Sequence, residues 1–256
     1  MSEINIIGCW TLYKKEVRRF LKVYNQTIFA PVITSLLFLA IFNLALGDRV
    51  KTIGGVNFGQ FVAAGLIMMS VMQNAFANTS SSFTMGKVLG TIVDLLMPPL
   101  SAGEITFAMT LAGITRGIMV GILVGVAITF FIPLNIYDFG YLLFSIISAS
   151  MLLALLGLLG GIFSETFDHM AAVTSYVITP LTFLSGTFYS VKNLPDIWYN
   201  VSQFNPFFYL IDGFRYGITG YHDGNLIYGA VFVSACNLIL WIASYYLIKK
   251  GYRIKQ

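Results

Sequence analysis

The sequence predicts an all-α, polytopic membrane protein with six transmembrane helices. Of its 256 residues, 57% are hydrophobic and only 10% are charged, and the mean hydropathy is +0.80. Soluble domains are about 45–50% apolar and about 25% charged, so a water-soluble fold is close to excluded. Six blocks with at most one charge are each long enough to cross a bilayer, which takes about 20 residues.

The six predicted spans follow one another through the chain. They lie at about residues 28–46, 58–77, 105–132, 141–163, 170–189 and 226–248. Pro180 falls in the middle of the fifth block and predicts a kink or a broken helix there. The spans leave no stretch long enough for a separate catalytic domain, so residues 1–256 are treated as a single transmembrane domain.

The Lys and Arg residues outside the spans predict the orientation. Residues 1–27 are too long and too polar for a cleaved signal, so the first span should remain as an anchor. If the N-terminus is inside, the inner segments carry ten Lys and Arg and the outer loops carry four. The positive-inside rule therefore puts both termini in the cytoplasm. The net charge of +4 is thereby explained by topology, and nucleic acid is not expected as a partner.

A cytoplasmic amphipathic helix is predicted within residues 1–27. Apolar residues recur at helical spacing and basic residues fall on the opposite side; the apolar set is Trp10, Tyr13, Val17, Phe20, Leu21 and Tyr24. This pattern describes a helix lying in the inner membrane surface. Alternatively, the basic residues are a topology signal with no further role.

The inner connection at 78–104 contains a second amphipathic segment. One side of a short helix would carry Val88, Leu89, Ile92, Val93, Leu95 and Leu96, and the other Lys87, Thr91 and Asp94. Pro98 and Pro99 end it. A helix tethered at both ends to spans could transmit force from a soluble partner; the alternative is a helix resting on the membrane surface.

The outer connection at 190–225 is too apolar and aromatic for a solvated loop. Irregular backbone is tolerated at membrane depth only where protein or water covers it. A pair of short re-entrant or interfacial helices fits this composition. An aromatic belt at the outer interface is the alternative, and both can hold.

The third predicted span combines a glycine ridge with the one intramembrane charge. Glycines recur every fourth residue at Gly113, Gly117, Gly121 and Gly125, and such a ridge lets a helix of the same chain or of a second copy approach closely. Arg116 marks a polar path or an ion pair if it is buried. If the span instead begins near Gly117, Arg116 snorkels to the inner interface.

The sequence shows no catalytic, metal-binding or nucleotide-binding pattern, so we expect no enzyme and no cofactor. Cys9 and Cys236 form neither a disulfide framework nor a metal framework. The predicted spans contain no Asp or Glu, which argues against proton-coupled transport. Gly86-Lys87 is followed by Val88 and lacks the preceding glycine of a phosphate-binding loop.

Two motifs resemble the permease subunits of ABC exporters of the drug, polysaccharide and lipo-oligosaccharide type. The first runs from Gly90 to Ser101 and is followed by Glu104; it is similar to the cytoplasmic element of that family. The second resembles the family's fifth span and re-entrant outer helices, and comprises Pro180, Ser185, Gly186, Pro195, Asn205, Pro206, Asp212 and Arg215. Two positions depart from the family. The family often has a glutamate where this chain has Val93, and often a proline where this chain has Ser190. The second difference should affect only the outer turn.

The resemblance implies an exporter permease of the bacterial inner membrane that pairs with a second copy of itself. A separate ATPase subunit would bind ATP and dock beneath a coupling helix at 83–97, with contact residues Lys87, Leu89, Gly90, Thr91, Asp94, Leu95, Leu96 and Glu104. The substrate stays open among drugs, lipids and glycans. The alternatives are a secondary transporter or facilitator that needs no ATPase, and a membrane scaffold protein.

Overall fold

A computed structural model describes residues 5–47 and 50–252, except for the side chains of Leu46, Leu95 and Leu96. Arg49, Arg253 and Lys255, which entered the orientation count, lie outside the described residues. Within them, five helices are long and apolar enough to cross a membrane. Four of these are α3 (Phe58–Val88), α5 (Ala102–Thr129), α6 (Phe139–Phe163) and α11 (Leu226–Lys250), and the fifth joins the π-helical turn η1 (Asn25–Phe29) to α2 (Ala30–Leu46).

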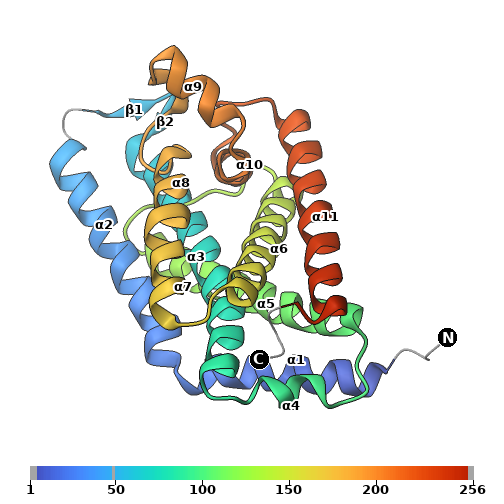
Figure 1. The fold of residues 1–256 in the computed structure, drawn as a ribbon. Helices are drawn as coiled ribbons and strands as arrows, with labels where there is room; N and C mark the ends of the chain where they lie inside the picture. Colours follow the sequence, from blue (N-terminus) through green and yellow to red (C-terminus); the bar gives the residue numbers. More distant parts are fainter. Residues whose placement is uncertain (1–4, 48–49, 253–256) are drawn as a thin grey trace.

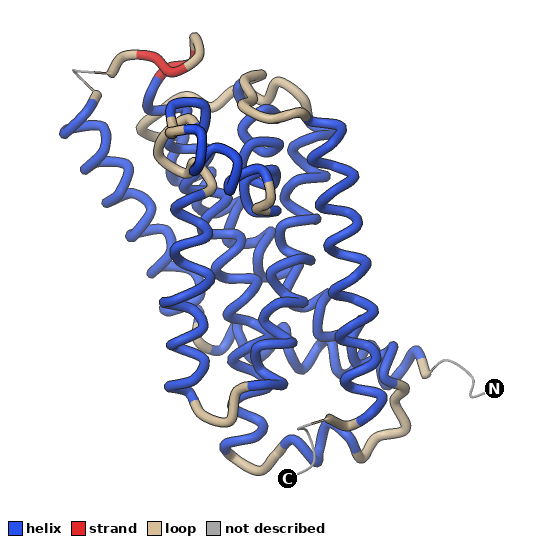
Figure 2. The backbone as a smooth tube through the Cα atoms, turned by 45° about the horizontal axis from the view of Figure 1, so that its top comes forward, coloured by secondary structure: helices blue, strands red, loops and turns tan. Residues whose placement is uncertain are grey.

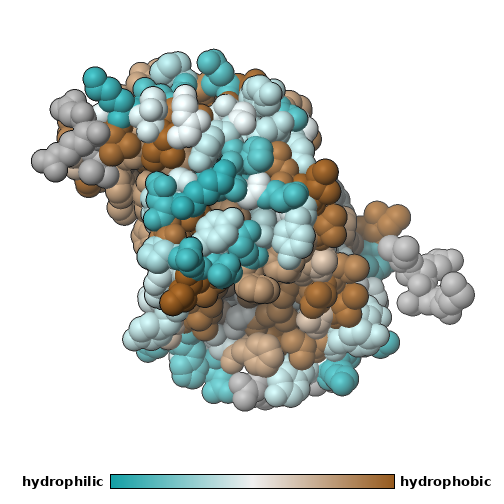
Figure 3. Space-filling model, turned by 90° about the horizontal axis from the view of Figure 1, so that it is seen from above, coloured by the Kyte–Doolittle hydropathy of each residue, from teal (hydrophilic) through white to brown (hydrophobic). Residues whose placement is uncertain are grey.

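The long helices form an elongated bundle whose two ends differ (Figures 1 and 2). The basal end carries α1 (Ile6–Lys22), α4 (Ile92–Leu96) and the last turns of α11. The apical end carries a small hairpin, β1 (Thr52–Ile53) and β2 (Val56–Asn57), and the short helix α9 (Asp196–Gln203). Seen from the apical end, the surface mixes hydrophilic and hydrophobic residues (Figure 3). The hairpin is a departure from the predicted all-α fold.

Helix α3 is the central helix and is longer than predicted. It packs against α5, α6 and α10 (Pro206–Thr219), and 83% of its most apolar window is buried. The predicted end at residue 77 is wrong because the polar run that follows is helical and buried. Asn78, Thr79 and Thr84 are fully covered, and Thr79 donates to the Ala154 carbonyl at 2.7 Å.

The predicted fifth span is the least regular helical segment. It consists of α7 (Phe167–Val173), the π-helical turn η2 (Thr174–Ile178) and α8 (Thr179–Leu184). Pro180 lies in the first turn of α8, where it has no N–H to donate, so the backbone widens just before it. The segment ends at Leu184, short of the predicted residue 189, and Ser185 to Ser190 continue as buried or half-buried non-helical chain.

The amphipathic helix α1 exists, but its interior face differs from the predicted one. Leu12, Glu16 and Phe20 are buried, whereas Trp10 and Tyr24 of the predicted apolar face are half exposed. Spacing of four residues places Leu12, Glu16 and Phe20 in one row. Glu16, which no sequence pattern assigned to either face, therefore faces the bundle.

Candidate functional site

The predicted coupling segment is a broken helix at the basal end. Helix α3 runs through Val88, and Gly90 then adopts φ +70°, a conformation that only glycine enters at little cost. Helix α4 covers just five residues after this turn. The prediction of one amphipathic helix from Val88 to Leu96 is therefore wrong: the two apolar halves lie on separate elements.

The side chains of this segment divide between the bundle and the surface. Ile92 is buried against Gly86, while Thr91 and Asp94 are exposed. Four apolar side chains are half exposed or more, namely Val88, Leu89, Val93 and Met97. The side chains of Leu95 and Leu96 lie outside the described residues. Val88, Leu89, Val93 and Met97 together give the basal end an apolar surface, here called the basal patch.

Lys87 and Glu104 hold the ends of helices and do not belong to α4. The Lys87 ammonium donates to the carbonyls of Ile162 and Ser164, the latter at 3.2 Å, and so satisfies the C-terminal end of α6. Glu104 is the third residue of α5 and forms a capping box with Ser101. Its other carboxylate oxygen accepts from the Asn5 backbone N–H. The Ser101-x-x-Glu104 spacing is a sequence signature of a helix start, and it was missed.

Arg116 is an interior residue of the bundle. Helix α5 begins at Ala102, and the Arg116 side chain is 8% exposed. One Nη donates to Asn74 Oδ1 on α3 at 3.0 Å, and Nε has no hydrogen-bond partner.

The glycine ridge packs within the chain. A Cβ on Gly113 would meet Ala154 of α6 at 2.6 Å, and one on Gly117 would meet Ser150 at 2.5 Å. A Cβ on Gly121 would meet Val71 of α3 at 2.6 Å, whereas Gly125 has only Ile67 within 4 Å, at 3.8 Å. The first three glycines therefore permit the approach of α3 and α6 to α5.

Five of the apical motif residues make hydrogen bonds around α10, in three separate groups. Arg215 is almost fully buried, donates to the Gly186 carbonyl at 2.7 Å and lies 3.7 Å above the centre of the Phe61 ring. Asn205 caps α10 and donates to Ser185 Oγ at 2.8 Å and to the Leu181 carbonyl at 3.1 Å.

The fifth of these residues, Asp212, ties α10 to the chain that follows it. Its two oxygens accept from the backbone N–H groups of Asp223 and Gly224 at 2.7 and 2.8 Å. Asp223 in turn accepts from Ser190 Oγ at 2.7 Å and from Tyr221 at 2.6 Å. Burial and this hydrogen bond raise the pKa of Tyr221, so the phenol remains the donor.

The other three motif residues shape the backbone. Pro180 is the second residue of α8, Pro195 precedes α9 and Pro206 is the first residue of α10; Pro180 and Pro195 are exposed. Sequence reasoning missed Tyr221 and Asp223, which no local pattern distinguishes from a polar loop. It also assigned Ser190 only to the outer turn, whereas the Ser190 hydroxyl donates to Asp223 and so connects the chain after α8 to the chain after α10.

Comparison with known proteins assigns this arrangement to a class. The ABC-2 type transporter family matches residues 8–219, which runs from within α1 to the end of α10. The chain therefore belongs to the ABC-2 type transporter family and is a membrane transport permease.

Individual relatives agree with this assignment. The chain is 40% identical over 255 residues to the inner membrane transport permease YadH of Escherichia coli K12, with 98% of both chains covered. It is 25% identical over 222 residues to nodulation protein J of Rhizobium leguminosarum bv. trifolii, covering 84% of this chain and 81% of the relative. A nodulation protein J of Rhizobium meliloti is 24% identical over 219 residues.

Proposed function

We propose that the chain is the membrane-spanning subunit of an ATP-driven exporter and is coupled to a separate ATPase subunit. The observation that carries this proposal is the basal patch, an apolar surface on elements tethered to α3 and α5. Leu89 and Met97 are 65% and 79% exposed, and exposed contiguous apolar surface on a protein marks an interaction site. The basal end also carries the basic residues of α1 and α11.

The proposed location of the protein is the bacterial inner membrane, which it would cross six times with both termini in the cytoplasm. In this proposal the irregular segment from α7 through α8, which is fifth in chain order, crosses the membrane in addition to the five long apolar helices. It runs along the bundle beside them (Figures 1 and 2). Helix α1 and the last turns of α11 lie at the same end, as an even number of crossings requires. The relative YadH is named an inner membrane transport permease, which supports this location.

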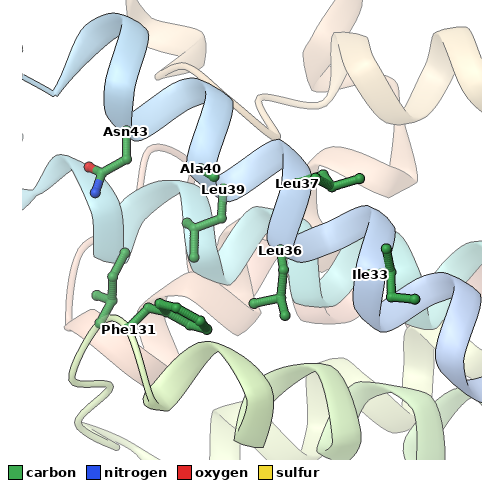
Figure 4. Close-up of a pocket in the computed structure, with 8 residues that line it drawn as sticks. Ile33, Leu36, Leu37, Leu39, Ala40, Asn43 and Phe131 are labelled. Atoms are coloured by element: carbon green, nitrogen blue, oxygen red, sulfur yellow. The ribbon is translucent and has the colours of Figure 1, made fainter.

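A second copy of the chain is proposed to pack along α2. This helix is only 11% buried over its most apolar window, and it stands away from the bundle at its apical end (Figure 1). A cavity of about 400 Å³ opens between α2 and the end of α5. Leu36 and Leu39 point from α2 toward Phe131, while Leu37 points away (Figure 4).

Reconstitution tests the central proposal. The purified chain in phospholipid vesicles should neither hydrolyse ATP nor pump, and both activities should appear when a cognate ATPase subunit is added. The matched control is the ATPase alone, which should hydrolyse ATP without accumulating substrate. Transport by the chain alone under an ion gradient would overturn the proposal and favour a secondary transporter.

A further inference from the structure

One face of α3 carries a row of polar side chains near the basal end. Ser70, Asn74, Asn78 and Ser81 succeed one another at intervals of three or four residues and therefore share a face. We call this row the α3 polar stripe. Each member bonds to another element: Ser70 to Ser35 of α2 at 2.8 Å, Asn74 to Arg116 of α5, and Asn78 and Ser81 to Arg19 of α1.

Two guanidinium groups thus meet the same stripe one helical turn apart. Arg19 donates to the Asn78 carbonyl at 2.6 Å and to Ser81 Oγ at 3.2 Å. Within the described part of the chain, Glu16 is the one carboxylate at ion-pair distance from either arginine, 3.1 Å from Arg19. Two positive charges and one negative charge therefore lie together against α3, and Arg116 has no anionic partner.

The stripe also has spare hydrogen-bond donors. Arg116 Nε and Asn78 Nδ2 are buried and without a partner, and the parent side chains are 8% and 0% exposed. A buried donor that is left unpaired costs about 1–3 kcal/mol, and more when the group is charged. An uncompensated guanidinium is retained against this cost when another state of the protein, or a ligand, satisfies it.

One edge of the stripe is half buried, and its apical end lies next to an apolar cavity. Gln73 and Ala77 flank the stripe on α3 and, like its member Ser81, are half buried. At its apical end, Ser35 lies on α2 between residues that line the cavity of Figure 4, Ile33 and Leu36. That cavity, about 400 Å³ and mostly apolar, has the size of a small-molecule site.

We propose that Arg116 and Arg19, with the α3 polar stripe, bind the anionic headgroup of an amphipathic molecule whose apolar tail follows α2 toward the cavity. Arg is suited to this task because its planar guanidinium binds phosphate, sulfate or carboxylate oxygens through paired N–H groups. The proposal deepens the proposed transport function by naming a substrate chemistry, but headgroup binding needs no ATPase. Binding and ATP-driven pumping can therefore fail independently.

The test uses the full chain in phosphatidylcholine nanodiscs, with dodecyl phosphate as the probe and dodecanol as its uncharged counterpart. Dodecyl phosphate should bind, and Arg116→Gln should weaken binding about tenfold or more, as loss of a charge-assisted hydrogen bond implies. The control is Lys22→Gln, which removes one exposed charge from α1, the helix that carries Arg19, and should change the affinity less than twofold. Equal binding of dodecanol, or an unchanged affinity in Arg116→Gln, would overturn the proposal.

A second variant separates binding from folding. Asn74→Asp places a carboxylate where Arg116 already donates, so it should abolish dodecyl phosphate binding while the melting temperature is kept or raised. Unchanged binding in this variant would also overturn the site. Addition of phosphatidylglycerol to the nanodisc then identifies the source: competition assigns the site to a lipid headgroup, and no competition assigns it to cargo.

Discussion

At the scale of single residues, buried charges are the most informative feature of this permease. Arg215 and Asp212 lie within one turn of α10, but each forms its hydrogen bonds with backbone groups of other segments, and Arg215 Nε has no partner. Arg215 holds the Gly186 carbonyl, and Asp212 holds the chain at Asp223 and Gly224. The motif residues thus fix irregular backbone in place, which explains why they are spread along the sequence.

Replacement of Arg215 by leucine should destabilise the protein strongly. The change leaves the buried Gly186 carbonyl without its charged donor and removes the guanidinium from the Phe61 ring, a loss of about 1.5–3 kcal/mol. Thermal and denaturant unfolding of the purified protein would measure it. Lys192→Ala is the control: its ammonium is half exposed and 4.0 Å from Asp223, so a change of about 0.5 kcal/mol or less is expected. Equal effects of the two variants would contradict the assigned role of Arg215.

At the scale of elements, some core helices approach so closely that only glycine, which has no Cβ, fits at the contact. A Cβ on Gly157 of α6 would lie 2.4 Å from the Phe76 carbonyl oxygen of α3, and backbone cannot move aside as a flexible side chain can. Gly125 of α5 has open space around it by comparison. Two glycines in apolar helices therefore have different structural consequences, which the sequence alone does not reveal.

Gly157→Ala should accordingly cost about 1–3 kcal/mol, the usual penalty of overpacking. Gly125→Ala should be neutral or stabilising by up to about 1 kcal/mol, because alanine favours helix over glycine. Unfolding of both variants in the same detergent provides the comparison. A destabilisation of Gly125→Ala as large as that of Gly157→Ala would show that these contacts do not control packing.

A further prediction at this scale concerns the segment that carries the basal patch. Gly90→Trp forces a bulky residue into a left-handed conformation, and Asp94→Arg reverses an exposed charge. Either should abolish ATPase recruitment and transport while expression is retained; Asp94→Arg should leave the melting temperature unchanged, and Gly90→Trp should lower it by the strain of about 1–2 kcal/mol at this position. Asp196→Arg makes the same charge reversal on the exposed apical helix α9 and should leave recruitment intact. Normal recruitment by the Gly90 and Asp94 variants would remove α4 from the coupling role.

At the scale of the whole molecule, the two ends of the bundle carry different functions in our proposal. The basal end carries the patch, α1 and the α3 polar stripe, and the apical end carries the hydrogen-bonded groups around α10. This division requires that the two ends lie on opposite sides of the membrane, with the basal end in the cytoplasm.

Cysteine labelling tests that orientation. In a Cys9→Ser, Cys236→Ser background, Asp196→Cys on α9 should react with a membrane-impermeant maleimide in intact spheroplasts. Glu165→Cys, in the exposed basal connection between α6 and α7, should react only after the membrane is opened. The reverse pattern would invert the topology and remove the patch from the cytoplasm.

Hydropathy and spacing by themselves determined the membrane class, the positions of the apolar helices within a few residues at most boundaries, and the irregular fifth segment. These properties depend on local composition and length, which can be read from the sequence, whereas the family was indicated by the resemblance of two motifs. The polar run after Ala77 was misread as a connection, because only packing against α1 and α6 buries Asn78 and Thr79 in a helix. The tertiary structure likewise decided that Arg116 faces inward, that Glu16 and Arg19 join it near α3, and that Asp223 accepts from Ser190. These outcomes depend on contacts between residues tens of positions apart, and no local pattern encodes which distant partner will satisfy a buried polar group.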